Sequence, residues 1–209
     1  MEAPMEAMLR SSGRLRKRFV PALYLDPFFF ARYVEAAVPE PPAGGPPAAP
    51  AADRDSYALI VHRVRAGGPP HAVASALTVL RWMQEVAPRY RAADEAGRTV
   101  STREESEFAG MRFQSWLNRY LGDALGGLLQ VDLQGFSLTA ESVWEEVPAL
   151  AIVDADCRCA LHALAARHFG CTLLATTQPE MVRICELLHA SGGPRALLGP
   201  QAVLAALAG

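Results

Sequence analysis

The strongest constraint on the fold is a run of regularly spaced apolar residues between residues 70 and 87. The spacing alternates between three and four positions, which places the side chains on one side of an α-helix. The members of this stripe are Val73, Ala76, Leu77, Leu80, Met83 and Ala87. They predict one long helix at the centre of the core, with Val73, Ala76, Leu77 and Leu80 almost fully buried.

Helix start and stop signals divide most of the remaining chain into further helices. Asp26-Pro27 predicts a helix over 27–38, because an aspartate caps helix N-termini and proline fits the first helical position. Other signals are Asp53 or Asp55 before a helix ending at 66, Thr102 and Glu105 before one ending near 125, Thr177 and Glu180 before one ending at 189, and Gly199-Pro200 before a last short helix. We expect an all-α fold, a five-helix bundle with an extra N-terminal helix. Residues 128–138 are left unassigned, since Leu129, Val131 and Leu133 alternate over too short a stretch to decide on a strand.

The chain is expected to form a single domain with a short arm at each end. Residues 1–18 read as a flexible basic arm, residues 19–188 as the helical domain, and residues 189–209 as a short C-terminal helix. Residues 39–52 are rich in proline, alanine and glycine and predict an insertion loop that cannot hold a helix. The basic cluster at 14–18 also fits a nuclear-import or phosphate-contact patch, and that alternative stays open.

Net charge argues against nucleic acid as a partner, and hydropathy argues against a membrane span. The formal net charge is −2 over 209 residues, so no general attraction to nucleic acid or to an anionic membrane surface is expected. Every apolar run is interrupted well before the roughly 20 residues that a membrane-spanning helix needs. With no secretory leader recognised, the sequence predicts a soluble intracellular protein, cytoplasmic or nuclear, that binds another protein.

Four cysteines occur in the last third of the chain, at positions 157, 159, 171 and 185. A zinc site could draw on Cys157, Cys159, His162 and His168, but two cysteines two positions apart on a helix point about 200° away from each other. We therefore expect no metal, and reduced cysteines packed as small side chains.

No catalytic pattern is recognised, and neither a catalytic residue nor a cofactor is predicted. No glycine-rich loop follows a strand, and no serine stands in a nucleophile elbow. Asp154 and Asp156 could act as an acid and base pair, but carboxylates at that position are typical of a helix N-terminus. Phe28, Phe29 and Phe30 span about 200° of a helix, so at least one of them should be exposed or covered by a partner.

The order of these elements resembles a cyclin box of the phosphate-regulon type, as found in divergent P- and U-type cyclins, over about residues 19–188. The residues that carry the resemblance are the stretches 69–83, 118–123, 168–174 and 177–180. The first matches the second box helix in its Ala76-Leu77 and Arg81 positions, and the second matches the end of the third box helix. Arg119 stands where the family has a lysine, and Ala163, Leu164 and Ala165 stand where it has a glutamate.

The resemblance implies a regulatory subunit that docks on a protein kinase and performs no chemistry itself. The docking residues that it implies are Arg119, Tyr120, Asp123, Glu141 and Glu145, with added contact area from Phe28 and Phe29. The missing lysine and glutamate also fit an alternative, in which the chain is a structural or adaptor subunit of a larger assembly.

Overall fold

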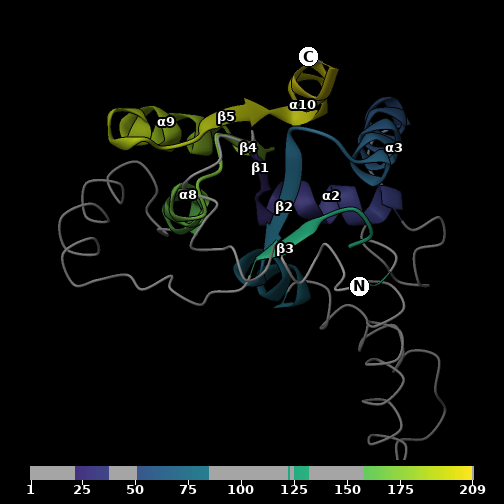
Figure 1. The fold of residues 1–209 in the computed structure, drawn as a ribbon, viewed down its shortest axis with the longest axis horizontal. Coiled ribbons are helices and arrows are strands. Elements are labelled where there is room, and N and C mark those ends of the chain that lie inside the picture. The colour runs from purple at the N-terminus through teal and green to yellow at the C-terminus, as the bar shows by residue number, and fades with distance from the viewer. Residues whose placement is uncertain (1–21, 38–50, 85–121, 123–124, 132–157, 209) are drawn as a thin grey trace, which may run out of the picture.

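The protein is a layered α/β domain built on a parallel sheet, as seen in a computed structural model that describes residues 22–37, 51–84, 122, 125–131 and 158–208 (Figure 1). The five strands lie in the order β3-β2-β1-β4-β5, and every pairing is parallel. Their bounds are β1 Ala22–Leu25, β2 His71–Ser75, β3 Leu129–Val131, β4 Leu173–Thr176 and β5 Arg195–Leu198.

The expectation of an all-α five-helix bundle is wrong, because strands run through segments that were assigned to helices or left unassigned. Residues 71–75 form β2 instead of the first turn of a central helix, and helical structure begins only at residue 76. A strand covered on both faces has no polar side, so its apolar run lacks the alternation that reveals a half-exposed strand. Ala22–Leu25 and Ala72–Ser75 are buried throughout for this reason.

The predicted apolar stripe is therefore split between a strand and a helix. Val73 is buried as part of β2, Ala76 and Leu77 are half-buried, and Leu80 is 52% exposed on the helical stretch 76–84. All four residues were expected to be almost fully buried, so the prediction is confirmed for Val73 and wrong for Ala76, Leu77 and Leu80. The spacing of three and four persisted by chance across the boundary between the two elements.

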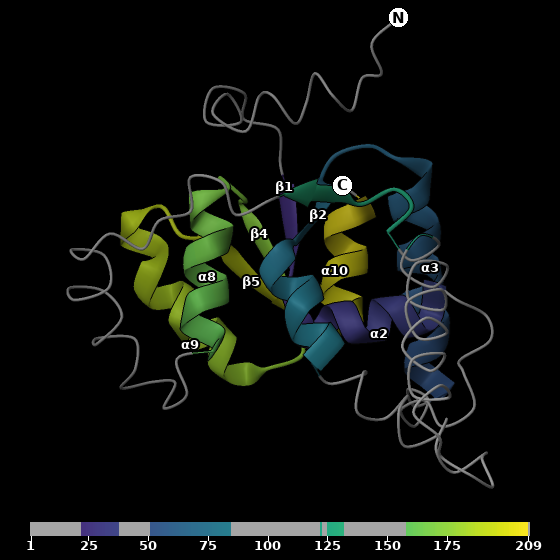
Figure 2. The ribbon, with the colours of Figure 1, turned by 90° about the horizontal axis from the view of Figure 1, so that it is seen from below.

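Helices cover both faces of the sheet (Figures 1 and 2). Their bounds are α2 Pro27–Ala37, α3 Ala51–Ala66, α8 Arg158–His168, α9 Pro179–Leu188 and α10 Gly199–Ala208, with a short 3-10 turn at His189–Ser191 after α9. The sheet's two faces carry two separate core clusters: one lies under α2, α3 and α10, and the other under α8 and α9. Successive residues of β1 alternate between them, with Leu23 and Leu25 on the first and Ala22 and Tyr24 on the second.

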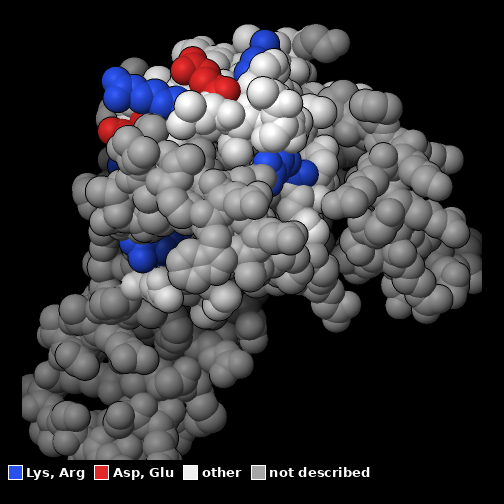
Figure 3. All heavy atoms as spheres, turned by 90° about the vertical axis from the view of Figure 1, so that its left-hand side faces the viewer, with Lys and Arg blue, Asp and Glu red and all other residues white. Residues whose placement is uncertain are grey.

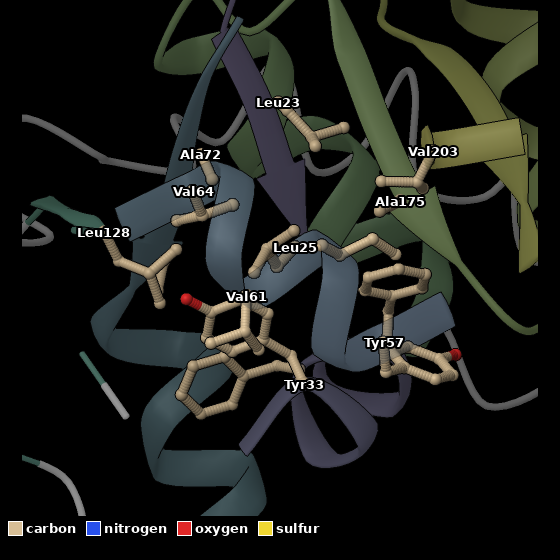
Figure 4. Packing of buried hydrophobic residues seen from close by; sticks show 14 of the residues in the cluster. Leu23, Leu25, Tyr33, Tyr57, Val61, Val64, Ala72, Leu128, Ala175 and Val203 are labelled. Carbon is tan, nitrogen blue, oxygen red and sulfur yellow. The ribbon is translucent and has the colours of Figure 1, made fainter. Parts of the chain in front are cut away.

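Large aromatic and aliphatic side chains fill the first face (Figure 4). Phe29 and Tyr57 lie with ring centroids 5.0 Å apart, joining α2 to α3. Phe30 meets Trp82 edge to face at 6.2 Å, joining α2 to the helix at 76–84. Much of the stability of the domain is expected to come from this cluster, because each aromatic ring removes a large apolar area from water.

Several helix boundaries were predicted correctly from capping residues. The Phe29 amide donates to Asp26 Oδ1 at 2.7 Å, which confirms Asp26 as the cap of α2. The helices that begin at Pro179 and at Gly199 also start near the expected residues. The predicted capping box at Thr177 and Glu180 is wrong, because Gln178 is the N-cap of α9 and no side chain caps it. Residues 1–18 and most of the predicted insertion at 39–52 lie outside the described residues, whereas Ala51 already belongs to α3.

Candidate functional site

The topology of the sheet marks one place where a binding site is expected. From β1 the chain moves to β2 and β3 on one side, and β4 then pairs with β1 on the other side. Parallel α/β sheets bind ligands outside the carboxyl ends of the strands at such a change of direction. Here those ends carry Asp26 after β1, Ser75 at the end of β2 and Thr176 at the end of β4.

The carboxylate of Asp26 is fully buried and held by the chain itself. Oδ1 accepts the Phe29 amide at 2.7 Å, and Oδ2 accepts the Thr176 hydroxyl at 2.5 Å. The Thr176 oxygen in turn accepts the amide of Gln178 at 3.0 Å, and the Asp26 amide donates to the Ala175 carbonyl at 3.1 Å. Asp26 therefore fastens the start of α2 to the end of β4 across the change of direction.

Burial raises the pKa of Asp26 from 3.8 to about 6, against the hydrogen bonds from Thr176 and Phe29, which lower it. The carboxyl group is thus ionised at neutral pH but only by a margin of about one unit. A general base would need a reacting proton within hydrogen-bond reach, and a metal ligand would need a free lone pair and further donors. Within the described part of the chain, no group of three or more histidine, cysteine or acidic side chains could hold a metal ion.

A second buried polar cluster lies near the carboxyl ends of β1 and β2, on the face of the sheet that α8 and α9 cover. The hydroxyl of Tyr24 lies 2.6 Å from Ser75 Oγ, 3.1 Å from Thr78 Oγ1 and 3.0 Å from His162 Nδ1. Thr78 Oγ1 also donates to the Leu25 carbonyl at 3.0 Å, and the Thr78 amide donates to Ser75 Oγ at 3.2 Å. The cluster joins β1, β2, the helix at 76–84 and α8.

The number of available protons limits how this cluster is arranged. A carbonyl only accepts, so the contact with Leu25 uses the Thr78 hydroxyl proton. Ser75 can then donate to Tyr24, and Tyr24 to His162 Nδ1, when the histidine is neutral with its proton on Nε2. Burial, with Arg81 nearby, lowers the pKa of His162 from 6.5 to about 4, so the neutral form dominates at neutral pH.

Three of the four cysteines are buried thiols, as predicted. Cys159, Cys171 and Cys185 all belong to the core under α8 and α9. Burial raises the pKa of Cys171 and of Cys185 to about 12, which disfavours the reactive thiolate. Cys157 lies outside the described residues.

A small pocket of about 170 Å³ lies at the amino end of β2, at the other end of the strands from Asp26. It is lined by the end of α3 at Arg63, the Gly67–Pro70 turn, His71 and Leu207. The Arg63 guanidinium donates to the Leu207 carbonyl at 3.0 Å, so its charge already serves to join α3 to α10. The carboxyl edge is the better candidate site, because the buried titratable groups gather there.

Most of the residues implied as kinase contacts lie outside the described residues: Arg119, Tyr120, Asp123, Glu141 and Glu145. Asp154 and Asp156, weighed as an acid and base pair, do so as well. Phe28 is half-buried, whereas Phe29 is fully buried against Tyr57 and forms part of the core instead of a contact surface. At least one of the three consecutive phenylalanines was expected to be exposed or covered by a partner. In the structure Phe28 is half-buried and Phe29 and Phe30 are fully buried, so none of the three is exposed.

Sequence reasoning missed the polar residues at the strand ends. Thr176, Ser75 and Thr78 gave no motif, because each became significant only once the parallel strands placed them side by side. The sequence did indicate a threonine that bonds to the backbone before α9, but Thr177 was chosen for that role. In the structure the hydroxyl oxygen of Thr176 accepts the hydrogen bond from the Gln178 amide. Asp26 was recognised as a helix cap, and its link to Thr176, 150 positions away, could not be read from spacing.

Comparisons with protein-family models, with curated proteins and with solved structures gave no match to this chain. The structure therefore defines a class alone: a parallel α/β domain with helices on both faces and buried polar groups at its carboxyl edge. Of the helices in the described ranges, none has the length and apolar character needed to cross a membrane.

Proposed function

We propose that this chain is a non-catalytic protein-binding domain, acting as a structural or adaptor subunit of a larger assembly. The observation that carries the proposal is the use of both Asp26 carboxylate oxygens within the protein, by the Phe29 amide and the Thr176 hydroxyl. At the place where parallel α/β domains bind ligands, the described side chains bond to one another. A site that binds or transforms a small molecule keeps such groups available to it.

The charge distribution supports a protein partner over nucleic acid. On the side of the molecule shown in Figure 3, basic and acidic side chains lie among many uncharged ones. The whole chain carries a net charge of −2. Binding to a phosphate backbone depends on concentrated positive charge, whereas protein interfaces are mixed and partly apolar.

Docking on a protein kinase, which the cyclin-box resemblance implies, stays a prediction. It presupposed a five-helix bundle, and the described residues form a parallel α/β fold instead. The adaptor proposal needs no particular helical surface, so the correction of the fold leaves it standing.

The proposal is tested by purifying the tagged full chain from the cells that express it, followed by quantitative mass spectrometry. We expect one or more non-kinase proteins in stoichiometric amounts. A stoichiometric kinase would favour the cyclin-like reading, and the absence of any stoichiometric protein would contradict both.

A parallel purification with Asp26→Asn tests the role assigned to the carboxyl edge. If Asp26 only fastens α2 to β4, a variant that keeps its circular dichroism spectrum retains the same partners. Loss of the partners by a folded variant would place the carboxyl edge in the binding site and contradict a purely structural role.

A further inference from the structure

The outer edge of β5 has no partner strand among the residues that the structure describes, and an exposed leucine lies beside it. Among the described strands, β4 is the one partner of β5, which leaves β5 at the edge of the sheet between α9 and α10 (Figure 1). The Arg195 amide donates to the Thr172 carbonyl at 2.9 Å, so Arg195 and Leu197 direct their backbone groups toward β4. In a parallel pair the intervening residues face the other way, which turns the backbone groups of Ala196 and Leu198 outward.

We propose that this edge joins two copies of the chain, with β5 pairing antiparallel to β5 of a second copy about a twofold axis. Ala196 then lies opposite Leu198 of the second copy, and each of these two pairs exchanges two hydrogen bonds. The half-buried Ala196 side chain leaves room for Leu198, which is 47% exposed in the single chain. The two side chains of each pair project from the same face of the sheet, so a large residue packs beside a small one.

The residues around the strand fix this register. Pro194 directly precedes β5 and has no amide proton to donate, and β5 ends at Leu198 because α10 begins at Gly199. The ladder therefore stops at both ends, which favours one closed pair over an open-ended association. Arg195, the one charged side chain in residues 192–208, is the first residue of β5, so in an antiparallel pair the two arginines lie at opposite ends of the joint.

The helix beside the edge also fits a second copy better than a lone extended peptide. α10 packs against both β4 and β5, Leu207 faces the end of α3, and the small residues Ala202 and Ala206 are half-buried against the core cluster. Across a twofold axis at the edge, the two α10 helices would lie about 10 Å apart, a normal packing distance for helices with small side chains. A single peptide strand would gain the few hydrogen bonds without this contact. The proposal is independent of the adaptor function, since it concerns a different surface and needs no other protein.

The test is the mass of the purified full chain in solution, by light scattering and by sedimentation equilibrium over a dilution series. We expect a species of twice 22.5 kDa that dissociates on dilution. Leu198→Glu should weaken dimerisation at least about tenfold, because it removes the leucine contact and places a charge at the joint. Leu59→Glu is the matched control, since Leu59 on α3 is also 47% exposed and lies away from β5.

Ala196→Pro supplies a second variant that acts on the backbone. It removes an outward amide and none of the bonds to β4, so a folded variant should be monomeric, with folding checked by circular dichroism. A parent chain that stays monomeric at its highest soluble concentration would overturn the proposal. So would a dimer that Leu198→Glu and Leu59→Glu affect equally.

Discussion

The two faces of the sheet are packed with side chains of different size and polarity, although residues of the same strands contribute to both. Under α2, α3 and α10 the core is a bulky cluster that includes Phe29, Phe30 and Trp82. Under α8 and α9 the side chains are smaller, with four alanines on α8 alone, and a hydrogen-bonded cluster around Tyr24 and His162 lies among them. The first face is stabilised by the burial of large apolar side chains. The second is stabilised also by hydrogen bonds between buried polar side chains.

Each face contains a fully buried tyrosine, Tyr24 on β1 and Tyr33 on α2, and the two tyrosines show the difference. The Tyr24 hydroxyl has three side-chain neighbours within hydrogen-bond distance. The Tyr33 hydroxyl has no hydrogen-bond partner among the described residues, and burial raises its pKa to about 12. The buried tyrosine hydroxyl is thus hydrogen-bonded on the face under α8 and α9, and on the other face it has no partner among the described residues. Removal of the hydroxyl by substitution with phenylalanine should therefore affect stability differently at the two positions.

The largest effect is expected from removing bulk on the first face. Phe30→Ala should lower the free energy of unfolding by about 3–5 kcal/mol, because Phe30 is fully buried and its loss leaves a cavity next to Trp82. Chemical denaturation measures the change. Phe28→Ala, at a half-buried position of the same helix, is the control, and an equal loss there would contradict the assignment of Phe30 to the core.

The next effect depends on pH and separates two buried groups of opposite sign. The folded pKa of His162, about 4, lies below its unfolded value of 6.5, so the stability that it contributes is present above pH 6.5 and is lost as the pH falls toward 4. The folded pKa of Asp26, about 6, lies above its unfolded value of 3.8, so its contribution is present below pH 3.8 and is lost as the pH rises through 6. The two largely cancel in the parent chain.

Single variants should expose each contribution. When the pH is lowered from 6.5 to 4, the free energy of unfolding of His162→Gln should rise relative to that of the parent. That of Asp26→Asn should fall relative to the parent, and each change should be on the order of 2–3 kcal/mol. Urea denaturation at several pH values measures both differences. Parallel profiles of parent and variant would show that the replaced group does not titrate differently on folding.

Matched removal of the two hydroxyls gives a smaller effect. Tyr24→Phe should destabilise the fold by about 1–3 kcal/mol, because Ser75 and His162 lose a buried partner. Tyr33→Phe should be neutral or slightly stabilising, because it removes a buried hydroxyl without a hydrogen bond. Equal losses in the thermal melts of the two variants would remove the distinction between the faces.

The smallest effect corrects the prediction from sequence. Leu80→Ala should change the free energy of unfolding by no more than about 0.5 kcal/mol, since Leu80 is 52% exposed and alanine favours a helix. Val73, from the same apolar stripe, is buried in β2, so Val73→Ala should cost several times more. A loss of 2 kcal/mol or more at Leu80 would restore it to the core, at odds with its exposure.

Local signals predicted the parts of the fold that local chemistry determines. The capping residue Asp26 predicts α2, and the prolines at 179 and 200 predict α9 and α10, each with nearly correct bounds. The sheet was missed because its strands have only three to five residues and are covered on both faces, so that residues 71–75 were assigned to a helix and residues 128–138 were left unassigned. The link between Asp26 and Thr176 depends on the pairing of β1 with β4, which no short-range pattern encodes.

The central claim is that the chain's own side chains close the carboxyl edge between β1 and β4. Hydrogen exchange of two backbone amides tests it most directly: Phe29, which donates to Asp26 Oδ1, and Gln178, which donates to Thr176 Oγ1. We predict slow exchange of both amides in the full chain, and faster exchange of both in Thr176→Val, which keeps the shape of the side chain and removes the hydroxyl. Rapid exchange of both amides in the parent chain would contradict the account, since it would show an edge that stands open to water.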